Sequence, residues 1–399
     1  MAQLRYEAIL EEVLTYRASS AARRKQIPFP QLAAPYGDSI ILFGAGNLGR
    51  KTLGGLRRLG IRPLAFVDNN PRLWDTSIDG LEVLSPVDAA KDFKDRAAFV
   101  VTIWSPGHRF SDTRQQLAVL GCSRVVSFLA LFNTHPAVFL PHVCIDLPHK
   151  IVADADDVRK AMALLADDQS RREYVAQLQW LLDPIDMGEG TFEASSGCKD
   201  IPEDLFSTLP DEVFVDCGAF DGDTIRHFLQ RSGGSFGKIV ALEPDPTNFQ
   251  KLEAYVSTLP RVVREKTTIR QVAIGARRER LRFQALGTVG ASLHESGEIM
   301  VDVVPLDEVV GDVFRPTHIK MDIEGAELDG LVGGRTVIAK SSPLLSICVY
   351  HRQDHLWKIP LAMQSLCDDY RIFLRRHSGE FWDLVCYGVP PDRMRVTGD

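Results

Sequence analysis

Short apolar segments alternate with helix-compatible segments in both halves of the chain. In the first half, runs typical of buried strands recur at residues 39–43, 63–67, 98–103 and 124–128. In the second half, strands are expected at residues 212–217, 238–242, 268–272, 318–321 and 344–349, with helices after 224, at 247–256 and at 326–331. Such alternation predicts a parallel sheet covered by helices in each half.

The end of the chain departs from this alternation. A hairpin is expected from residues 281–285 and 300–304, and a helix at 361–367 precedes strands at 370–374 and 384–387. Two consecutive strands separated by a short polar segment favour antiparallel pairing. The second sheet is therefore predicted to have seven strands that are mostly parallel, with the last strand antiparallel.

Helical spacing dominates the segments outside the two sheets. Residues 3–16 form an amphipathic pattern, and residues 154–182 read as a connector that ends at Asp183-Pro184, before a Gly- and Ser-rich linker at 187–197. The predicted fold is α/β, with an N-terminal helical segment (1–36), a Rossmann-like domain (37–150), a helical connector and linker (151–205) and a second Rossmann-like domain (206–399). The first helix is expected to pack on the first domain or on a second copy of the chain, which would make a homo-oligomer.

Composition narrows the classes of protein that remain. The 399 residues include 45% hydrophobic and 25% charged residues, as in ordinary soluble domains. A net charge of −7 argues against a nucleic-acid partner. Seven cysteines without a CxxC pair favour reduced thiols, and no metal-ligand spacing is present. We find no secretory leader and no run long enough to cross a membrane, and we expect a cytoplasmic protein.

One segment of the second half has the pattern of a cofactor loop. The strand at 212–217 delivers Asp216 at its carboxyl end, and Gly218 and Gly222 then allow a tight turn that a ligand can approach. The next strand ends at Glu243, where doubly wound folds use an acid to bind ribose hydroxyls. A solvated carboxylate at the strand end is the alternative for Glu243.

These segments, with Lys320-Met321-Asp322-Ile323-Glu324-Gly325-Ala326-Glu327, resemble the signatures of the FkbM family of methyltransferases over residues 205–390. The resemblance implies a class I methyltransferase fold and S-adenosylmethionine as cofactor. It also implies O-methylation of a hydroxyl on a sugar, a glycan or another small molecule. The residues it assigns to the cofactor are Asp216, Gly218, Ala219, Phe220, Gly222, Thr224, Glu243, Pro244, Ala273 and Asp322. Acceptor selectivity is expected from the loop at 287–297.

The catalytic candidates follow two neighbouring strands. Asp322 and Glu324 come after the strand at 318–321, and His351 comes after the strand at 344–349. Methyl transfer to a hydroxyl needs a nearby proton acceptor, for which carboxylates and an imidazole are suited. His351 is expected to act as the base or to orient the acceptor. Alternatives are that the two acids only cap the following helix, or that all three residues bind a divalent ion.

His355 is expected to be structural. His377, between the last two strands, is expected to line the acceptor site or to be a turn residue.

A second glycine loop lies in the first half of the chain. It follows the strand at 39–43, and an acid stands at the end of the next strand; the residues of this candidate nucleotide site are Gly44, Gly46, Asn47, Gly49 and Asp68. Taken alone, this pattern indicates an NAD-dependent oxidoreductase. The segment also resembles the small Rossmann-like domains at the front of sugar-modifying acyltransferases. It is therefore expected to bind a nucleotide or nucleotide-sugar, to hold a partner or to dimerise.

The sequence favours an S-adenosylmethionine-dependent methyltransferase with a small-molecule or carbohydrate acceptor. Two other hypotheses stay open. One is the NAD-dependent oxidoreductase, and the other is a scaffold that binds the cofactor without turnover.

Overall fold

The computed structural model describes residues 2–17, 29–105, 107–182, 204–284, 299–311, 313–378 and 382–395, together with residues 202, 292–293 and 297. The chain divides into two compact units. Unit 1 comprises Met1–Leu10, Asp154–Gln177 and Phe192–Asp399, and unit 2 comprises Glu11–Ala153 and Leu178–Thr191. Within the described ranges, no helix has both the length and the apolar character needed to cross a membrane. The linker predicted at 187–197 lies outside the described residues.

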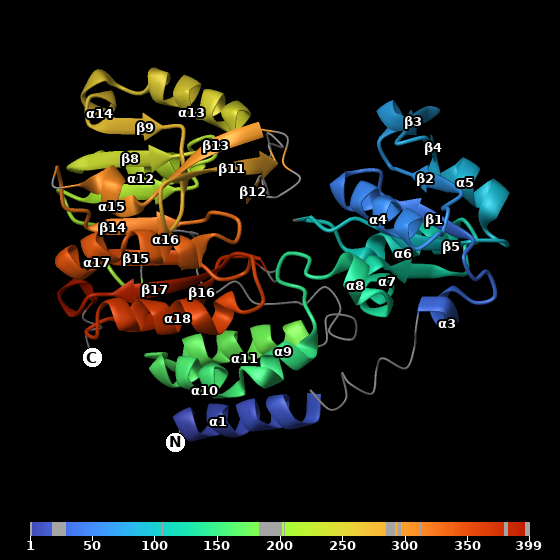
Figure 1. Cartoon of the computed structure of the whole chain (residues 1–399), viewed down its shortest axis with the longest axis horizontal. Coiled ribbons are helices and arrows are strands. Elements are labelled where there is room, and N and C mark those ends of the chain that lie inside the picture. The colour runs from blue at the N-terminus through green and yellow to red at the C-terminus, as the bar shows by residue number, and fades with distance from the viewer. Residues whose placement is uncertain are drawn as a thin grey trace. The chain divides into compact units, whose positions relative to one another are not determined.

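Unit 2 is built around a six-stranded sheet in the order β3-β4-β2-β1-β5-β6 (Figure 1). All pairs are parallel except that of the edge strand β3 with β4. The central strand β1 is buried at every position, as expected for a parallel strand covered on both faces. The elements are α3 (Phe29–Ala33), β1 (Ile40–Phe43), α4 (Asn47–Arg58), β2 (Ala65–Val67), the 3₁₀ helix η2 (Pro71–Leu73), β3 (Thr76–Ile78), β4 (Leu81–Leu84), α5 (Pro86–Phe93), β5 (Ala98–Val101), α6 (Phe110–Val119), β6 (Val125–Ser127), α7 (Phe128–Thr134), α8 (Pro136–Phe139) and α9 (Pro148–Ala153).

The sequence predicted about four strands in this unit and missed the hairpin of β3 and β4. Asp79 and Gly80 connect the two strands, both with positive φ (51° and 75°). Such a pair is a strong signal for a tight hairpin turn. The hairpin was overlooked because its strands are short and largely exposed, so they lack the apolar run that marked the other strands.

Unit 1 contains a seven-stranded sheet in the order β16-β17-β15-β14-β7-β8-β9. Strand β17 is antiparallel to both of its neighbours, and the other pairs are parallel. The predicted fold, a mostly parallel seven-stranded sheet with an antiparallel last strand, is thereby confirmed. The predicted hairpin is also confirmed as β11 and β13, which belong to a separate four-stranded sheet in the order β10-β13-β11-β12.

The elements of unit 1 and of the segments that join the units have the following bounds: α1 (Ala2–Glu12), the π-helix η1 (Val13–Arg17), α10 (Ala155–Leu164), α11 (Asp168–Leu182), β7 (Val213–Cys217), α12 (Asp223–Arg231), β8 (Lys238–Leu242), α13 (Pro246–Thr258), α14 (Arg261–Arg264), β9 (Thr267–Arg270), β10 (Ala273–Ile274), β11 (Glu279–Gln284), β12 (Ser292–Leu293), β13 (Ile299–Val304), α15 (Leu306–Val310), β14 (His318–Met321), α16 (Glu327–Gly333), α17 (Arg335–Ser341), β15 (Leu344–Cys348), α18 (His355–Leu366), β16 (Arg371–Arg376), β17 (Leu384–Val389) and the 3₁₀ helix η3 (Pro391–Arg393).

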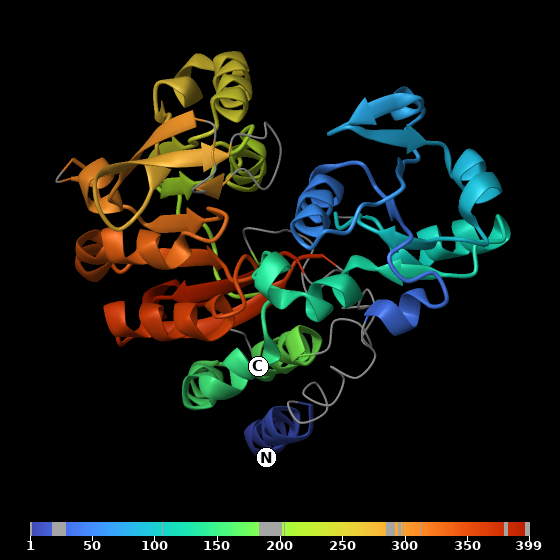
Figure 2. The same cartoon turned by 45° about the vertical axis from the view of Figure 1, so that its right-hand side comes forward.

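Two helices differ from the prediction. The helix expected at 361–367 begins earlier, at His355, and contains Pro360. A proline inside a helical pattern argues for a break, but here buried Trp357 and Ile359 pack that part of the helix into the core. The first helix was expected on the first domain or on a second copy. Within the chain, its Ala2–Leu10 part belongs to unit 1 rather than to the first domain, and α1 lies beside α10 and α11 in both views (Figures 1 and 2).

Two buried arginines attach α11 to the edge strand β16. Arg376, with no exposed surface, donates to Glu173 (3.0 Å) and Gln177 (2.8 Å). Arg375 donates to both Asp167 and Asp204 at 2.7 Å. Planar guanidinium groups suit such buried ion pairs because several donors are satisfied at once.

A buried ion pair joins the two central strands of the seven-stranded sheet. Asp216 on β7 and Lys320 on β14 are register partners, and Lys320 Nζ lies 2.9 Å from Asp216 Oδ1. Both side chains are almost fully excluded from solvent, at 0% and 4% exposure. Removing either partner would leave the other charge buried without its counter-ion.

We therefore expect Asp216→Asn and Lys320→Met each to lower the free energy of unfolding by about 3–5 kcal/mol. The double variant should lose less than the sum of the two, because neither charge is then left alone. Denaturant unfolding of the four proteins measures this coupling. As a control, Arg261→Ala removes an exposed ion pair with Glu265 and should cost at most about 1 kcal/mol. Additive losses in the double variant would contradict the coupling.

Candidate active site

Four adjacent parallel strands bring the predicted site residues to one edge of the seven-stranded sheet. The strands are β8, β7, β14 and β15, in that spatial order. Their carboxyl ends lead into residues 243–245, 218–222, 322–326 and 349–351. The predicted cofactor loop, the strand-end acid and the three catalytic candidates are therefore neighbours in space.

The loop after β7 is held tightly between its neighbours. The N–H groups of Gly218 and Ala219 both donate to the carbonyl of Leu242, at 2.9 and 3.1 Å. Gly218 has φ of +84°, and a Cβ atom there would lie 1.9 Å from the carbonyl oxygen of Asp322. Only glycine fits this position, because the loop after β7 touches the backbone after β14.

Asp216 is linked to this loop through Lys320. Its carboxylate has no exposed surface and is paired with Lys320, whose ammonium group also donates to the carbonyl of Gly218 at 3.1 Å. The charge of Asp216 therefore acts on the loop through Lys320. Sequence reasoning included Lys320 in the motif but gave it no role.

Glu243 connects the ends of β8 and β7. Its Oε2 accepts the N–H of Phe220 and its Oε1 accepts the N–H of Asp245, both at 2.9 Å. Each carboxylate oxygen has capacity for a further hydrogen bond. Burial raises the pKa of Glu243 to about 7, against the lowering effect of these two N–H donors, and the charges of Asp245 and Asp216 raise it further.

The remaining cofactor candidates differ in exposure. Gly218, Phe220 and Pro244 are partly exposed, and Ala219, Gly222 and Thr224 are buried. Ala273 is 6% exposed and packs in the core of the four-stranded sheet, so its side chain faces protein.

The three catalytic candidates form one cluster around His351. Its Nε2 lies 3.3 Å from Asp322 Oδ1 and 3.5 Å from Glu324 Oε2. The hydroxyl of Tyr350 also donates to Asp322 Oδ1, at 3.2 Å. The side chains of Asp322 and Glu324 keep 18% and 31% of their surface exposed, whereas His351 keeps 4%. The two carboxylates are thus the members of the cluster that a substrate can reach.

Glu327 is the residue that organises this cluster, and sequence reasoning gave it no role. Its carboxylate is fully buried, 2.8 Å from His351 Nδ1 and 3.1 Å from His355 Nδ1. It also accepts the N–H groups of Ile323 (2.9 Å) and Gly325 (3.1 Å). The loop between these two residues contains Glu324 in a left-handed conformation, with φ of +54°. Glu327 therefore stabilises a backbone conformation that a non-glycine residue rarely adopts.

The charges of the cluster fix the protonation of His351. Burial alone would lower its pKa, but the carboxylates of Glu327, Glu324 and Asp322 raise it to about 10. Burial would likewise raise the pKa of Glu327, but the imidazoles of His351 and His355 hold it well below its ordinary value. At neutral pH His351 is therefore an imidazolium, which has no lone pair to act as a base. Of its two predicted roles, the geometry favours orientation.

The other predicted histidines have protein partners. His355 contacts Glu327, as described above, and the ring of His377 lies 2.8 Å from the hydroxyl of Tyr387. Across the described ranges, no group of three or more His, Cys, Asp or Glu side chains has the geometry to hold a metal ion.

The second glycine loop lies in unit 2 and is built in a similar way. A Cβ atom on Gly49 would lie 1.9 Å from the carbonyl oxygen of Gly44, so the loop and the first turn of α4 need glycine to approach each other. Asp68, at the end of β2, accepts the N–H of Ala45 at 2.9 Å. Gly46 and Asn47 begin α4 without a side-chain cap.

The family comparison decides the class of unit 1. Residues 216–380 match the family described as the methyltransferase FkbM domain. The chain contains an FkbM methyltransferase domain. The matched range includes all the predicted cofactor and catalytic residues, and the glycine loop of unit 2 lies outside it.

One solved structure with a high TM-score agrees with this fold. A methyltransferase FkbM from Methylobacillus flagellatus KT aligns with a TM-score of 0.71 at 22% identity, over 98% of this chain and 99% of that chain. A putative rRNA-methylase from Clostridium thermocellum aligns with a TM-score of 0.31 at 8% identity, over 48% and 91%. A precorrin-6y C5,15-methyltransferase from Geobacter metallireducens GS-15 aligns with a TM-score of 0.27 at 13% identity, over 44% and 77%. A comparison with curated proteins gave no significant match.

The position of Glu327 in the FkbM domain gives a test of the charge cluster. Glu327→Gln keeps an oxygen acceptor for the two loop N–H groups but removes the negative charge nearest to His351. We expect the pKa of His351 to fall from about 10 toward its ordinary value of 6.5. A pH titration of the histidine resonances by NMR would measure it.

The same variant should change how stability depends on pH. Because the folded-state pKa of His351 is raised, its contribution to stability is complete below pH 6.5 and is lost as the pH rises toward 10. The melting temperature of the wild type should therefore decline over this range, and that of Glu327→Gln should decline less. Asp329→Asn, an exposed acid on the same helix, is the control and should behave as the wild type. An unchanged His351 titration in Glu327→Gln would contradict the assignment.

Proposed function

We propose that the FkbM domain transfers a methyl group from S-adenosylmethionine to a hydroxyl of a sugar, a glycan or another small molecule. The observation that supports this most directly is the shared sheet edge. There, the strand-end acid Glu243 lies one strand from the glycine loop, and the carboxylates of Asp322 and Glu324 follow the next strand on the other side. Ligands of open α/β sheets bind at this edge.

The described residues fit the cofactor. The carboxylate of Glu243 already accepts two backbone N–H groups and has lone pairs left for the two ribose hydroxyls. Gly218, Phe220 and Pro244 are partly exposed around it and would contact the rest of the cofactor. When bound, S-adenosylmethionine supplies an electrophilic methyl group on a cationic sulfonium. Partly exposed carboxylates at this edge favour that positive charge.

Asp322 and Glu324 are the proposed proton acceptors. Both lie within 3.5 Å of His351 Nε2, and both retain exposed surface for an acceptor. A hydroxyl that donates a hydrogen bond to either carboxylate is held in place and can pass its proton to that oxygen as the methyl group is transferred. His351 and Glu327 hold the two carboxylates in position through the loop.

Hydroxyl-rich acceptors agree with an acceptor site lined by carboxylates. Carboxylate oxygens accept hydrogen bonds from several sugar hydroxyls at once. The loop at 287–297, expected to give acceptor selectivity, lies outside the described residues except for residues 292–293 and 297.

The raised pKa of Glu243 predicts how cofactor binding depends on pH. The ionised carboxylate is the form that accepts ribose hydroxyls, and with a pKa of about 7 it predominates only above neutral pH. The affinity for S-adenosylhomocysteine should therefore rise about tenfold between about pH 6 and about pH 8. Calorimetric titration at several pH values measures this rise.

In Glu243→Gln the affinity should fall by about tenfold or more at pH 8, and the rise with pH should disappear. Glu253→Gln, an exposed acid on α13, serves as the control and should keep the wild-type profile. Wild-type affinity in Glu243→Gln would place the cofactor elsewhere.

Turnover distinguishes an enzyme from a scaffold. With a panel of monosaccharides, nucleotide-sugars and small phenols as acceptors, we expect S-adenosylhomocysteine to form with at least one of them. Asp322→Asn and Glu324→Gln should each lower kcat about a hundredfold or more, because general-base catalysis contributes roughly that much. The affinity for S-adenosylhomocysteine, which lacks the sulfonium charge, should stay within about twofold. Asp329→Asn should retain activity.

The competing hypotheses make different predictions. A scaffold would bind S-adenosylhomocysteine and form no product with any acceptor. An NAD-dependent oxidoreductase would bind NAD and reduce it in the presence of an alcohol substrate, with no need for Glu243.

A further inference from the structure

The end of β2 in unit 2 repeats the arrangement found at the end of β8 in unit 1. Asp68 Oδ2 accepts the N–H of Ala45 and Oδ1 accepts the N–H of Asn70, both at 2.9 Å. Glu243 makes the equivalent pair of bonds, to its glycine loop and to the residue two positions further on. In both units the acid follows the strand next to the one that carries the glycine loop. The geometry that suits a ribose in unit 1 is therefore present a second time.

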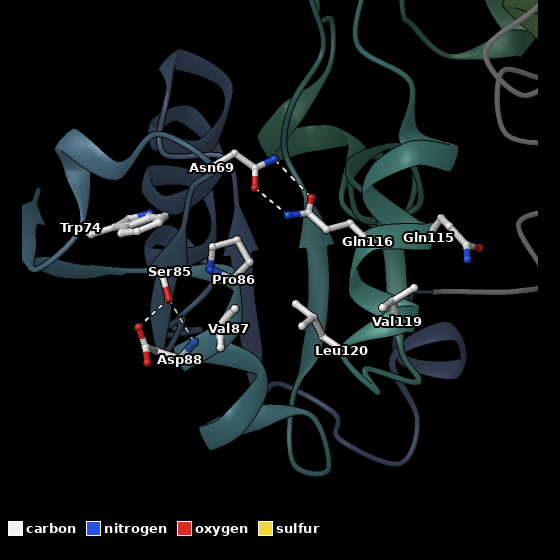
Figure 3. Close-up of a pocket in the computed structure, with 10 residues that line it drawn as sticks. All are labelled: Asn69, Trp74, Ser85, Pro86, Val87, Asp88, Gln115, Gln116, Val119 and Leu120. Carbon is white, nitrogen blue, oxygen red and sulfur yellow. Dashed lines mark hydrogen bonds between the residues drawn. The ribbon is translucent and has the colours of Figure 1, made fainter.

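A groove of about 720 Å³ begins at the residue after Asp68 (Figure 3). Asn69 and Gln116 form one end of it, where their side-chain amides donate to each other at 3.2 and 2.8 Å. Pro86 and Val87 line one side and Leu120 lines the other. The groove lies between α5 and α6, so two helices and the turn after β2 form its walls.

One side chain of the lining is bonded to the backbone of Asp68. Trp74, which also lines it, donates its indole N–H to the backbone carbonyl of Asp68 at 2.7 Å. This bond fixes the ring beside the groove, where its flat apolar surface is available for stacking.

The chemistry of the lining matches a planar ligand of low charge. Val87 and Val119 are 62% and 76% exposed and add apolar surface to the lining, against which a flat ring can pack. Each amide of the Asn69 and Gln116 pair keeps one donor and acceptor capacity for the edge of a ring. The lining contains no Lys or Arg, so the groove itself does not suit an anionic group.

We propose that unit 2 binds the nucleoside part of a nucleotide, with the ribose hydroxyls on Asp68 and the base in the groove beside Trp74 and Gln116. The attachment of the base to the ribose explains why the groove starts next to the acid. This site is separate from the proposed methyl-transfer site, and neither proposal depends on the other.

Binding to the full-length protein tests the proposal, with ADP, UDP and NAD as separate probes. We expect at least one probe to bind with a stoichiometry of one and to change the fluorescence of Trp74, a change that Trp74→Phe removes. ADP or NAD binding indicates a purine in the groove, and UDP binding a pyrimidine. If none of the three binds at millimolar concentration, the proposal is wrong.

Matched variants assign the site. Asp68→Asn and Gln116→Ala should each weaken nucleotide binding about tenfold or more and leave the affinity for S-adenosylhomocysteine unchanged. Ser111→Ala is the control for Gln116, because Ser111 is an exposed residue of the same helix that does not line the groove. Asp75→Asn is the control for Asp68, as an exposed acid in the same turn.

The reverse test uses unit 1. Glu243→Gln should weaken binding of S-adenosylhomocysteine and leave nucleotide binding unchanged. Nucleotide binding that depends on Glu243 and not on Asp68 would show that the probes occupy the methyltransferase site, and would overturn the proposal.

Discussion

The concentration of acidic groups at one edge of the seven-stranded sheet is the constraint on which the site depends. Asp216, Glu243 and Glu327 are buried there, and Asp322 and Glu324 lie beside them. Unbalanced, such carboxylates would repel one another and would take up protons. Two buried cations, Lys320 and the imidazolium of His351, offset part of this charge. Lys320 also contacts the loop after β7, and His351 contacts the loop after β14. The bonds that stabilise the buried carboxylates therefore also set the positions of these loops.

The two units share one arrangement of a carboxylate and a glycine loop. In each, a carboxylate after the second strand ties a glycine loop to the turn that follows the strand. The surroundings differ. Glu243 is 6% exposed and has a raised pKa, whereas Asp68 is partly exposed and the residue after it lines a groove that also includes Trp74. The two proposed ligand sites therefore share a similar backbone geometry and differ in the chemistry around it.

Much of the architecture could be predicted because buried parallel strands are mostly apolar. Strand β1 and strand β14 are buried at every position, and the acids that follow such strands must gather at one edge. The hairpin of β3 and β4 was not predicted because its strands are short and largely exposed. Its only sequence signal is the Asp79-Gly80 turn. The first turns of α18 were not predicted because Pro360 argues against a helix there. Tertiary packing of this part of the helix compensates for the unfavourable helix propensity of proline. The central place of Glu327 could not be predicted, since it depends on two histidines that approach from the segment after β15.

The protonated state of His351 determines which groups at this edge of the sheet can accept a proton. A neutral imidazole beside an acceptor hydroxyl would be the stronger base, but Glu327 keeps the proton on His351. In the proposed reaction the carboxylates of Asp322 and Glu324 are weaker bases, so we expect proton removal to accompany methyl transfer rather than to precede it. In such a reaction the precise placement of the acceptor oxygen matters more than the basicity of the group that receives the proton. The buried bonds from Glu327 to the loop N–H groups and to His351 provide that placement.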